Sequence, residues 1–188
     1  MPNEAKQLIP GYAGHSMSKV DFLNWKPDDG FVYEWNNGVL EPTYGMKQEE
    51  LFIIQRITRQ FAKTSAYEHF SELVSEINCW VSDEQMRRPD LSYYTAEQIR
   101  ETAAGKNVIP AFVIEIISEH DDIRKVERKL IEYFKAGVQV VWRIIPDIRT
   151  VSVYTSPKTV VICTDDDVIH AAPVVPDLTL TVNDLLKI

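Results

Sequence analysis

The chain has 188 residues, of which 45% are hydrophobic and 26% are charged, so it is long enough to bury a core and has an ordinary globular composition. Its formal net charge of -8 argues against sequence-independent binding of nucleic acid, which normally relies on clustered Lys and Arg. Two isolated cysteines indicate neither a disulfide framework nor a cysteine zinc site. The sequence does not open with a signal-peptide pattern, and no apolar run approaches the roughly 18 residues of a membrane helix. We therefore expect a cytoplasmic protein without a membrane partner.

Capping and turn residues divide the first part of the chain into short elements. Ser18 followed by Asp21 has the pattern of a capping box, which predicts the start of a helix. The Asn37-Gly38 pair readily takes the positive φ angles of a tight turn, which predicts a hairpin. In chain order, we expect a loose or draped tail at 1–17, a short helix at 18–25, hairpin strands at 31–35 and 39–41, and an amphipathic helix at about 48–62.

A long apolar run marks the centre of the second part of the chain. Residues 111–117 are mostly β-branched or aromatic, as expected of a central strand that is covered on both faces. The other predicted elements are strands at 73–77, 79–81 and 91–94, a turn at 83–85, helices at 95–105 and about 122–136, a strand at 138–145, meander strands at 151–154 and 160–163, and a closing strand and short helix within 177–188. The pattern predicts one mixed α/β domain over 1–188, with a strand–helix–strand unit at 111–145 as its core.

Glu115 is an acid inside this otherwise apolar run. Burying an ionised carboxylate among Phe, Val and Ile is costly unless a partner or a metal ion neutralises it. Asp90 is a second acid, which follows Pro89 where the strand at 91–94 begins. Carboxylate oxygens are ligands that suit Mg²⁺ or Mn²⁺. We therefore expect Asp90 and Glu115 to share a divalent metal ion.

Lys129 and Tyr133 lie one turn apart on the predicted helix at 122–136. At about 100° per residue, Lys129 falls at the border of the apolar stripe, so its stem can pack on the sheet while its ammonium reaches toward Glu115. There it could orient a water molecule or help deprotonate it. Tyr133 could support the site with a hydrogen bond, and Glu41 could add a carboxylate from the hairpin.

Basic residues near the predicted site are candidates for contacts with phosphate groups. Arg88 precedes the Pro89-Asp90 pair, and Arg128 lies beside Lys129 on the predicted helix. The four histidines are scattered without the paired spacing of a zinc site, and no Gly-rich phosphate loop is present.

Each candidate residue also fits a structural role. Asp90 could cap a turn, and Glu115 could be one half of a buried ion pair. Tyr133 could serve packing alone. The remaining candidates could be solvated side chains at the surface, namely Lys129, Glu41, Arg88 and Arg128.

Several segments together carry a family resemblance. They are Tyr33-Glu34 with Gly38-Val39-Leu40-Glu41, the run from Arg87 to Tyr93, the run from Val113 to Ser118, and the run from Lys129 to Val138 with Trp142. In order and spacing, over roughly 31–155, they resemble the Uma2 family, formerly named DUF820. The resemblance implies a restriction-endonuclease-like PD-(D/E)XK fold, with an α/β mixed sheet, flanking helices and additional antiparallel strands. It also implies an Mg²⁺-dependent nuclease in which Asp90 and Glu115 hold the metal ion.

The sequence departs from the family pattern at two places. Ile117 stands where the general PD-(D/E)XK pattern has a lysine, and Lys129 is our candidate for its replacement. Family members also often carry a histidine at the start of the first long helix, and the segment 46–50 has none.

These observations lead to hypotheses from different classes. The first is an Mg²⁺-dependent endonuclease, also supported by Mn²⁺, that hydrolyses DNA phosphodiester bonds with Asp90, Glu115 and Lys129 as catalytic residues. The second is a catalytically inactive nuclease-fold module for binding or interaction, which Ile117 and the acidic net charge motivate. A metal-dependent hydrolase of another phosphoester is a third. Long apolar strands and four tryptophans also make a homodimer plausible.

Overall fold

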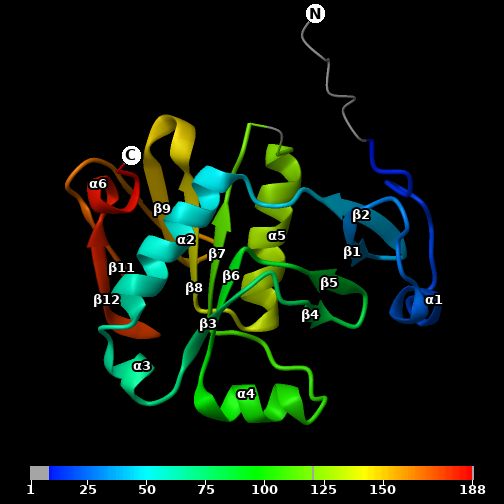
Figure 1. The fold of residues 1–188 in the computed structure, drawn as a ribbon, viewed down its shortest axis with the longest axis horizontal. Helices are drawn as coiled ribbons and strands as arrows, with labels where there is room; N and C mark the ends of the chain where they lie inside the picture. Colours follow the sequence, from blue (N-terminus) through cyan, green and yellow to red (C-terminus); the bar gives the residue numbers. More distant parts are fainter. Residues whose placement is uncertain (1–8, 120, 188) are drawn as a thin grey trace, which may run out of the picture.

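In the computed structural model, which describes residues 9–119 and 121–187, a central sheet lies between two long helices (Figure 1). α2 (Gln48–Phe61) covers one face of this sheet and α5 (Ile123–Ala136) covers the other. The remaining elements are α1 (Lys19–Asn24), β1 (Val32–Asn36), β2 (Val39–Thr43), α3 (Ser65–Glu68), β3 (Glu72–Ser75), β4 (Cys79–Ser82), β5 (Gln85–Arg87), β6 (Leu91–Tyr94), α4 (Ala96–Ala103), β7 (Phe112–Ile116), β8 (Val140–Ile145), the short 3-10 helix η1 (Pro146–Ile148), β9 (Thr150–Ser156), β10 (Thr159–Cys163), β11 (Val168–Ala171), β12 (Val175–Thr181) and α6 (Val182–Leu185). The predicted mixed α/β class with flanking helices is confirmed.

The central sheet has the strand order β10-β9-β8-β7-β6-β3. α5 connects the parallel neighbours β7 and β8, so the predicted strand–helix–strand core is present. Successive side chains of a strand point to opposite faces of a sheet. Phe112, Ile114 and Ile116 belong to the core beneath α2, whereas Val113 packs with α5. Glu115 shares the face of Val113, so the strand directs it toward α5.

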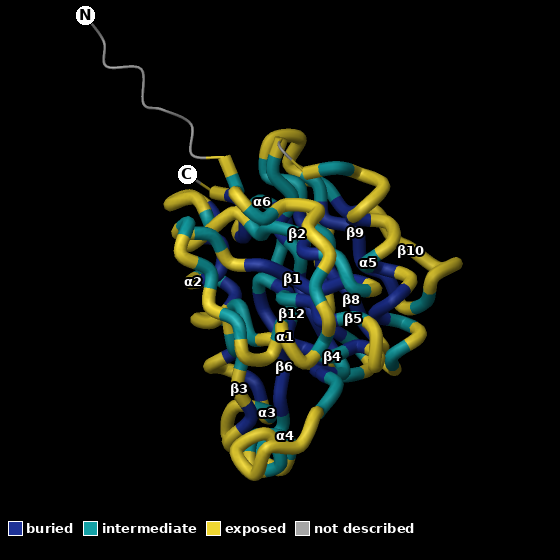
Figure 2. Tube along the Cα trace, turned by 90° about the vertical axis from the view of Figure 1, so that its right-hand side faces the viewer, coloured by how far each residue is buried: buried dark blue, intermediate teal, exposed yellow. Residues whose placement is uncertain are grey.

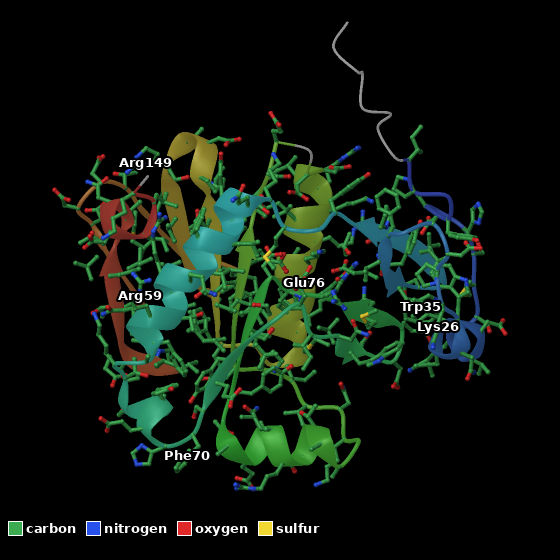
Figure 3. All side chains as sticks on the ribbon, viewed as in Figure 1. Lys26, Trp35, Arg59, Phe70, Glu76 and Arg149 are labelled. Atoms are coloured by element: carbon green, nitrogen blue, oxygen red, sulfur yellow. The ribbon has the colours of Figure 1, made fainter. Side chains whose placement is uncertain are left out.

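A small lobe, made of α1 and the antiparallel sheet β2-β1-β5-β4, stands beside the central sheet at the right of Figure 1. Asn37 and Gly38, both with positive φ, form the two-residue turn between β1 and β2, as the Asn-Gly pair predicts. Trp35, shown within this lobe in Figure 3, belongs to its aromatic-rich core. β5 was not predicted, because it has only three residues and two successive ones are buried, so it lacks the alternating pattern of a half-buried strand.

The C-terminal part of the chain forms a separate two-stranded sheet, β11-β12, which packs beside α2 together with α6. β12 and α6 correspond to the predicted closing strand and short helix. β11 and α3 were not predicted, since each has only four residues. Figure 2 shows the buried segments gathered in the middle of the molecule and the exposed turns around its rim.

The expected N-terminal tail is described from residue 9 onward, and residues 1–8 lie outside the described part of the chain. Residues 9–17 run beside the β1–β2 hairpin, where Ser16 forms an isolated bridge with Val39 and Gly14 N donates to Leu40 O at 2.8 Å. This segment therefore extends the small lobe. Among the described residues, no helix is both long enough and apolar enough to cross a membrane.

Candidate active site

The antiparallel pairing of β6 with β7 brings the two candidate metal ligands together. Leu91 lies opposite Ile114, so by the same register Asp90 lies across from Glu115. Residues opposite each other in an antiparallel pair project from the same face. Asp90 Oδ2 also accepts a hydrogen bond from Ile116 N at 2.6 Å, which holds its carboxylate at the end of β7.

Asp90, Glu115 and Lys129 all line one cavity of about 280 Å³. Its wall comes from β2, the loop at 44–47, the start of α2, the end of β7 and the first half of α5. Acidic lining residues outnumber basic ones by seven (Glu34, Glu41, Glu50, Asp90, Glu115, Asp121 and Asp122) to four (Lys47, Arg88, Lys125 and Lys129). The excess of negative charge favours a cation in this cavity.

A buried network of ion pairs holds Lys129 at the cavity. Its Nζ donates to Glu34 Oε1 at 2.8 Å, and Glu34 Oε2 accepts from Arg87 Nη1 at 3.0 Å. Arg87 is only 1% exposed and also pairs with Glu41 at 2.8 Å and with Glu132 at 2.7 Å. Glu34 lies on β1 and Lys129 on α5, so an acid of the small lobe sets the position of a cation beside the central sheet.

The negative charge of Asp90 and Glu115 is only partly compensated. Burial raises the pKa of Asp90 well above its ordinary value, and the charge of Glu115 raises it further. Burial likewise raises the pKa of Glu115, although the charge of Lys129 and the hydrogen bond from Tyr133 oppose the change. One oxygen of Asp90 accepts from Ile116 N and one oxygen of Glu115 accepts from the Tyr133 hydroxyl. Within the described chain no hydrogen bond reaches the second oxygen of either acid, so both are free to face a cation.

Lys129 and Tyr133 both remain protonated at neutral pH. Burial alone would lower the pKa of Lys129, but the charges of Glu34 and Glu115 outweigh it, and the net effect raises this pKa. Burial raises the pKa of Tyr133 well above its ordinary value, and the charge of Glu115 adds to the increase. Lys129 is therefore a fixed positive charge, and Tyr133 is a hydrogen-bond donor to Glu115.

The other predicted site residues lie in different surroundings. Glu41 lines the cavity but is bonded to Arg87. Burial would raise the pKa of Glu41, yet the hydrogen bond and charge of Arg87 lower it. Arg88 also lines the cavity, with its Nη1 bonded to Asn78 Oδ1 at 2.9 Å. Arg128 is exposed on α5 and is not among the residues around the cavity.

Sequence reasoning missed two buried acids, Glu34 and Glu50. Glu34 had the same signal as Glu115, because it stands between Tyr33 and Trp35 in a predicted strand. Glu50 continues the buried stripe of α2, lines the cavity and has its pKa raised by burial. It belongs to the segment 46–50, where the family resemblance led us to expect a histidine that this sequence lacks.

Ile117 shares the cavity wall with Lys129. It lies just beyond the end of β7, two positions after Glu115, and both residues line the cavity on its β7 side. Lys129 approaches that side from α5, and a cation is therefore present near the acids even though position 117 does not supply one.

The donor set around the cavity fits a cation held partly by non-protein ligands. Within residues 9–119 and 121–187, no group of three or more His, Cys, Asp and Glu side chains is arranged to hold a metal ion. Asp90 and Glu115 would thus supply two carboxylates, and water or substrate would complete the coordination. Mg²⁺ is typically bound in this way, through one or two carboxylates together with water and substrate phosphates.

Comparison with known proteins agrees with this fold. The model of the Uma2 family, described as "Putative restriction endonuclease", matches residues 20–183. The crystal structure of a "putative nuclease belonging to DUF820" from Anabaena variabilis has a TM-score of 0.76 and 20% sequence identity, over 89% of this chain and 96% of that chain. A comparison with curated proteins gave no match.

The molecule therefore has the restriction-endonuclease-like α/β fold that the sequence resemblance implied, with two carboxylates facing one cavity. The family match spans most of the sequence, and the chain belongs to the Uma2 family.

Proposed function

We propose that this protein is a metal-dependent endonuclease that hydrolyses phosphodiester bonds in DNA, with Mg²⁺ as its cofactor and Mn²⁺ as a substitute. The observation that carries the proposal is the pair of Asp90 and Glu115, which lie across from each other in an acidic cavity and each keep one carboxylate oxygen free. Membership of the Uma2 family, described as "Putative restriction endonuclease", supports the choice of reaction.

Each residue of the site has a physical role in this proposal. Asp90 and Glu115 hold the divalent ion, whose chemistry is to neutralise charge on the scissile phosphate and to lower the pKa of a water molecule. Tyr133 fixes the orientation of Glu115 through its hydroxyl. Lys129 orients the water or stabilises charge on the phosphate through its ammonium, which the charges of Glu34 and Glu115 favour. Glu34 holds the Lys129 ammonium in place.

The test is incubation of the purified protein with supercoiled plasmid DNA and either Mg²⁺ or Mn²⁺, with EDTA as the control. Nicked or linear plasmid should form only when metal is present. A protein that binds neither metal in a calorimetric titration and cleaves no DNA would instead favour the inactive nuclease-fold module that Ile117 suggests.

Replacing Lys129 with methionine should separate catalysis from metal binding. The side chain keeps most of its length but loses the charge near Glu115, so cleavage should fall by about 10²-fold or more, a typical effect of losing a positioned polar group. The stabilisation of the protein by Mg²⁺ should persist, because both carboxylates remain. Cleavage rates and thermal melting with and without Mg²⁺ measure the two effects. Unchanged cleavage in this variant would show that Lys129 has no catalytic role.

The acidic net charge does not spread evenly over the surface. A groove of about 460 Å³ between α2 and β12 is lined by four basic residues and one acidic residue, namely Arg56, Arg59, Lys63, Lys187 and Asp184. Figure 3 shows Arg59 on this side of α2. Glu50 lines the acidic cavity, and Arg59 lies nine residues further along the same helix, a rise of about 14 Å. This length corresponds to about four nucleotides along one DNA strand. The groove therefore supports a phosphate-backbone contact beside the proposed cleavage site.

Replacing Arg59 with glutamine should weaken DNA binding and reduce its salt dependence. One lost phosphate contact should lower the slope of log affinity against log salt by about 0.9. Arg100, which is exposed on α4, is the matched control, and Arg100→Gln should leave the slope unchanged. Fluorescence anisotropy with a labelled duplex at several salt concentrations measures both. Equal slopes for the two variants would contradict a role for the groove.

A further inference from the structure

One edge of the central sheet is an exposed apolar strand. β10 is the last strand in the sheet order, and within the described chain only β9 pairs with it. Val160, Val161 and Ile162 are 42%, 60% and 64% exposed. Figure 2 shows β10 at the rim of the molecule. Successive residues of a strand alternate between faces, so both faces of this edge are apolar.

An edge of this kind is unusual, because unpaired backbone groups invite another strand and proteins normally protect them with charge, proline or a covering element. β10 has no charged residue and no proline. Its one irregularity, a register shift between Thr159 and Val160, lies at the hairpin end and leaves residues 160–163 in regular pairing with β9. The opposite edge strand, β3, begins with a glutamate and ends with a serine.

We infer that β10 is a dimerisation strand, which pairs antiparallel with β10 of a second copy of this chain and joins the two central sheets into one. A two-fold axis through Val161 would place this residue opposite itself and Val160 opposite Ile162 of the second copy, so that apolar side chains meet on both faces. Two or three residues of each strand would donate and accept the backbone hydrogen bonds that β9 does not use.

The residues flanking β10 fit a second copy in this antiparallel orientation. Lys158 precedes the strand, and Asp165 and Asp166 follow it, all of them exposed. In the two-fold arrangement residue 158 lies opposite residue 164 of the second copy, so each Lys158 comes close to the acidic turn of the other chain. A parallel pairing would place lysine beside lysine and acid beside acid. The charge pattern therefore selects the antiparallel self-pairing.

Sedimentation velocity over a wide range of protein concentration tests this inference. The wild-type protein should shift from monomer to dimer as concentration rises, because a single strand pair makes a small interface. Val161→Lys should weaken the dimer by about tenfold or more, since the two-fold axis would bring the two new charges together. Val168→Lys is the matched control, because Val168 is an exposed strand valine (53%) outside this edge, and it should dimerise like the wild type.

A cysteine at position 161 gives a second, direct test. Residues opposite each other in an antiparallel pair have Cα atoms about 4.5–5.5 Å apart, within the range that a disulfide bridges. Mild oxidation of Val161→Cys should therefore produce a covalent dimer that a reductant reverses, whereas Val168→Cys should stay monomeric under denaturing electrophoresis. The native Cys79 and Cys163 are buried. A wild type that stays monomeric at every concentration, or a Val161→Lys variant that dimerises like the wild type, would overturn the inference.

Discussion

Replacing Glu115 with glutamine should abolish metal-dependent DNA cleavage while leaving the fold intact. Glutamine keeps an oxygen that can accept the hydrogen bond from Tyr133, so the contact with α5 survives. The variant loses the negative charge that would hold the divalent ion opposite Asp90. Metal catalysis contributes several kcal/mol of transition-state stabilisation, which corresponds to roughly 10³-fold or more in rate. Plasmid cleavage over a range of Mg²⁺ and Mn²⁺ concentrations measures the loss.

Thermal melting distinguishes a lost ligand from a damaged fold. At a Mg²⁺ concentration about 100 times its dissociation constant, binding should stabilise the wild type by about 2.7 kcal/mol, or a Tm increase of roughly 5–10 °C. Glu115→Gln should melt cooperatively without metal and show no increase with it. Cleavage that persists undiminished in this variant would show that Glu115 does not hold the metal.

Replacing Arg87 with methionine should destabilise the protein more than any of the other substitutions proposed for it. The guanidinium is 1% exposed and pairs with Glu34, Glu41 and Glu132, which would be left as a cluster of unneutralised acids. Removing one partner of a buried ion pair typically costs about 3–5 kcal/mol, and in this network three acids lose the same partner. Urea unfolding of the variant and the wild type measures the difference in the free energy of unfolding.

Acidification should reduce the difference between Arg87→Met and the wild type. Arg87 lowers the pKa of Glu41 in the folded protein, so this part of the wild-type stability is present above the ordinary pKa of about 4.5 and is lost as the pH falls below it. Arg128→Met is the control, because Arg128 is an exposed residue on α5, and its effect should stay within about 0.5 kcal/mol. Similar stabilities for the two variants at neutral pH would contradict the importance of the buried network.

The parts of the fold that local pattern specifies were predictable from the sequence. The apolar run at 111–117 and the apolar stripe of the predicted helix at about 122–136 identified β7 and α5, since both signals are short-range. Glu115 was recognisable as the acid within that apolar run. The structure brings Asp90, Glu115 and Lys129 to one cavity.

Features that depend on distant contacts were not predictable in the same way. The sequence alone does not reveal the role of Arg87, because nothing near it in the chain shows that β1, β2 and α5 would each bring an acid to it. Glu34 falls within a segment of the family resemblance that implies no role for it, although its position between two aromatic residues is informative. Short strands such as β5 and β11 depend on neighbouring strands for their stability, so their own residues carry little signal.

The ion pair between Glu34 and Lys129 joins β1 of the small lobe to α5, two elements that are distant in the sequence, and this has a consequence for any shortened form of the protein. In the intact chain the Lys129 ammonium is drawn toward β1 and forms its ion pair there, although the charge of Glu115 also acts on it. Without the N-terminal hairpin, the Lys129 ammonium would lose this partner, and we expect it to pair with Glu115, which we propose as a ligand of the divalent ion. The hairpin therefore restrains Lys129, which would otherwise block the proposed metal ligand Glu115.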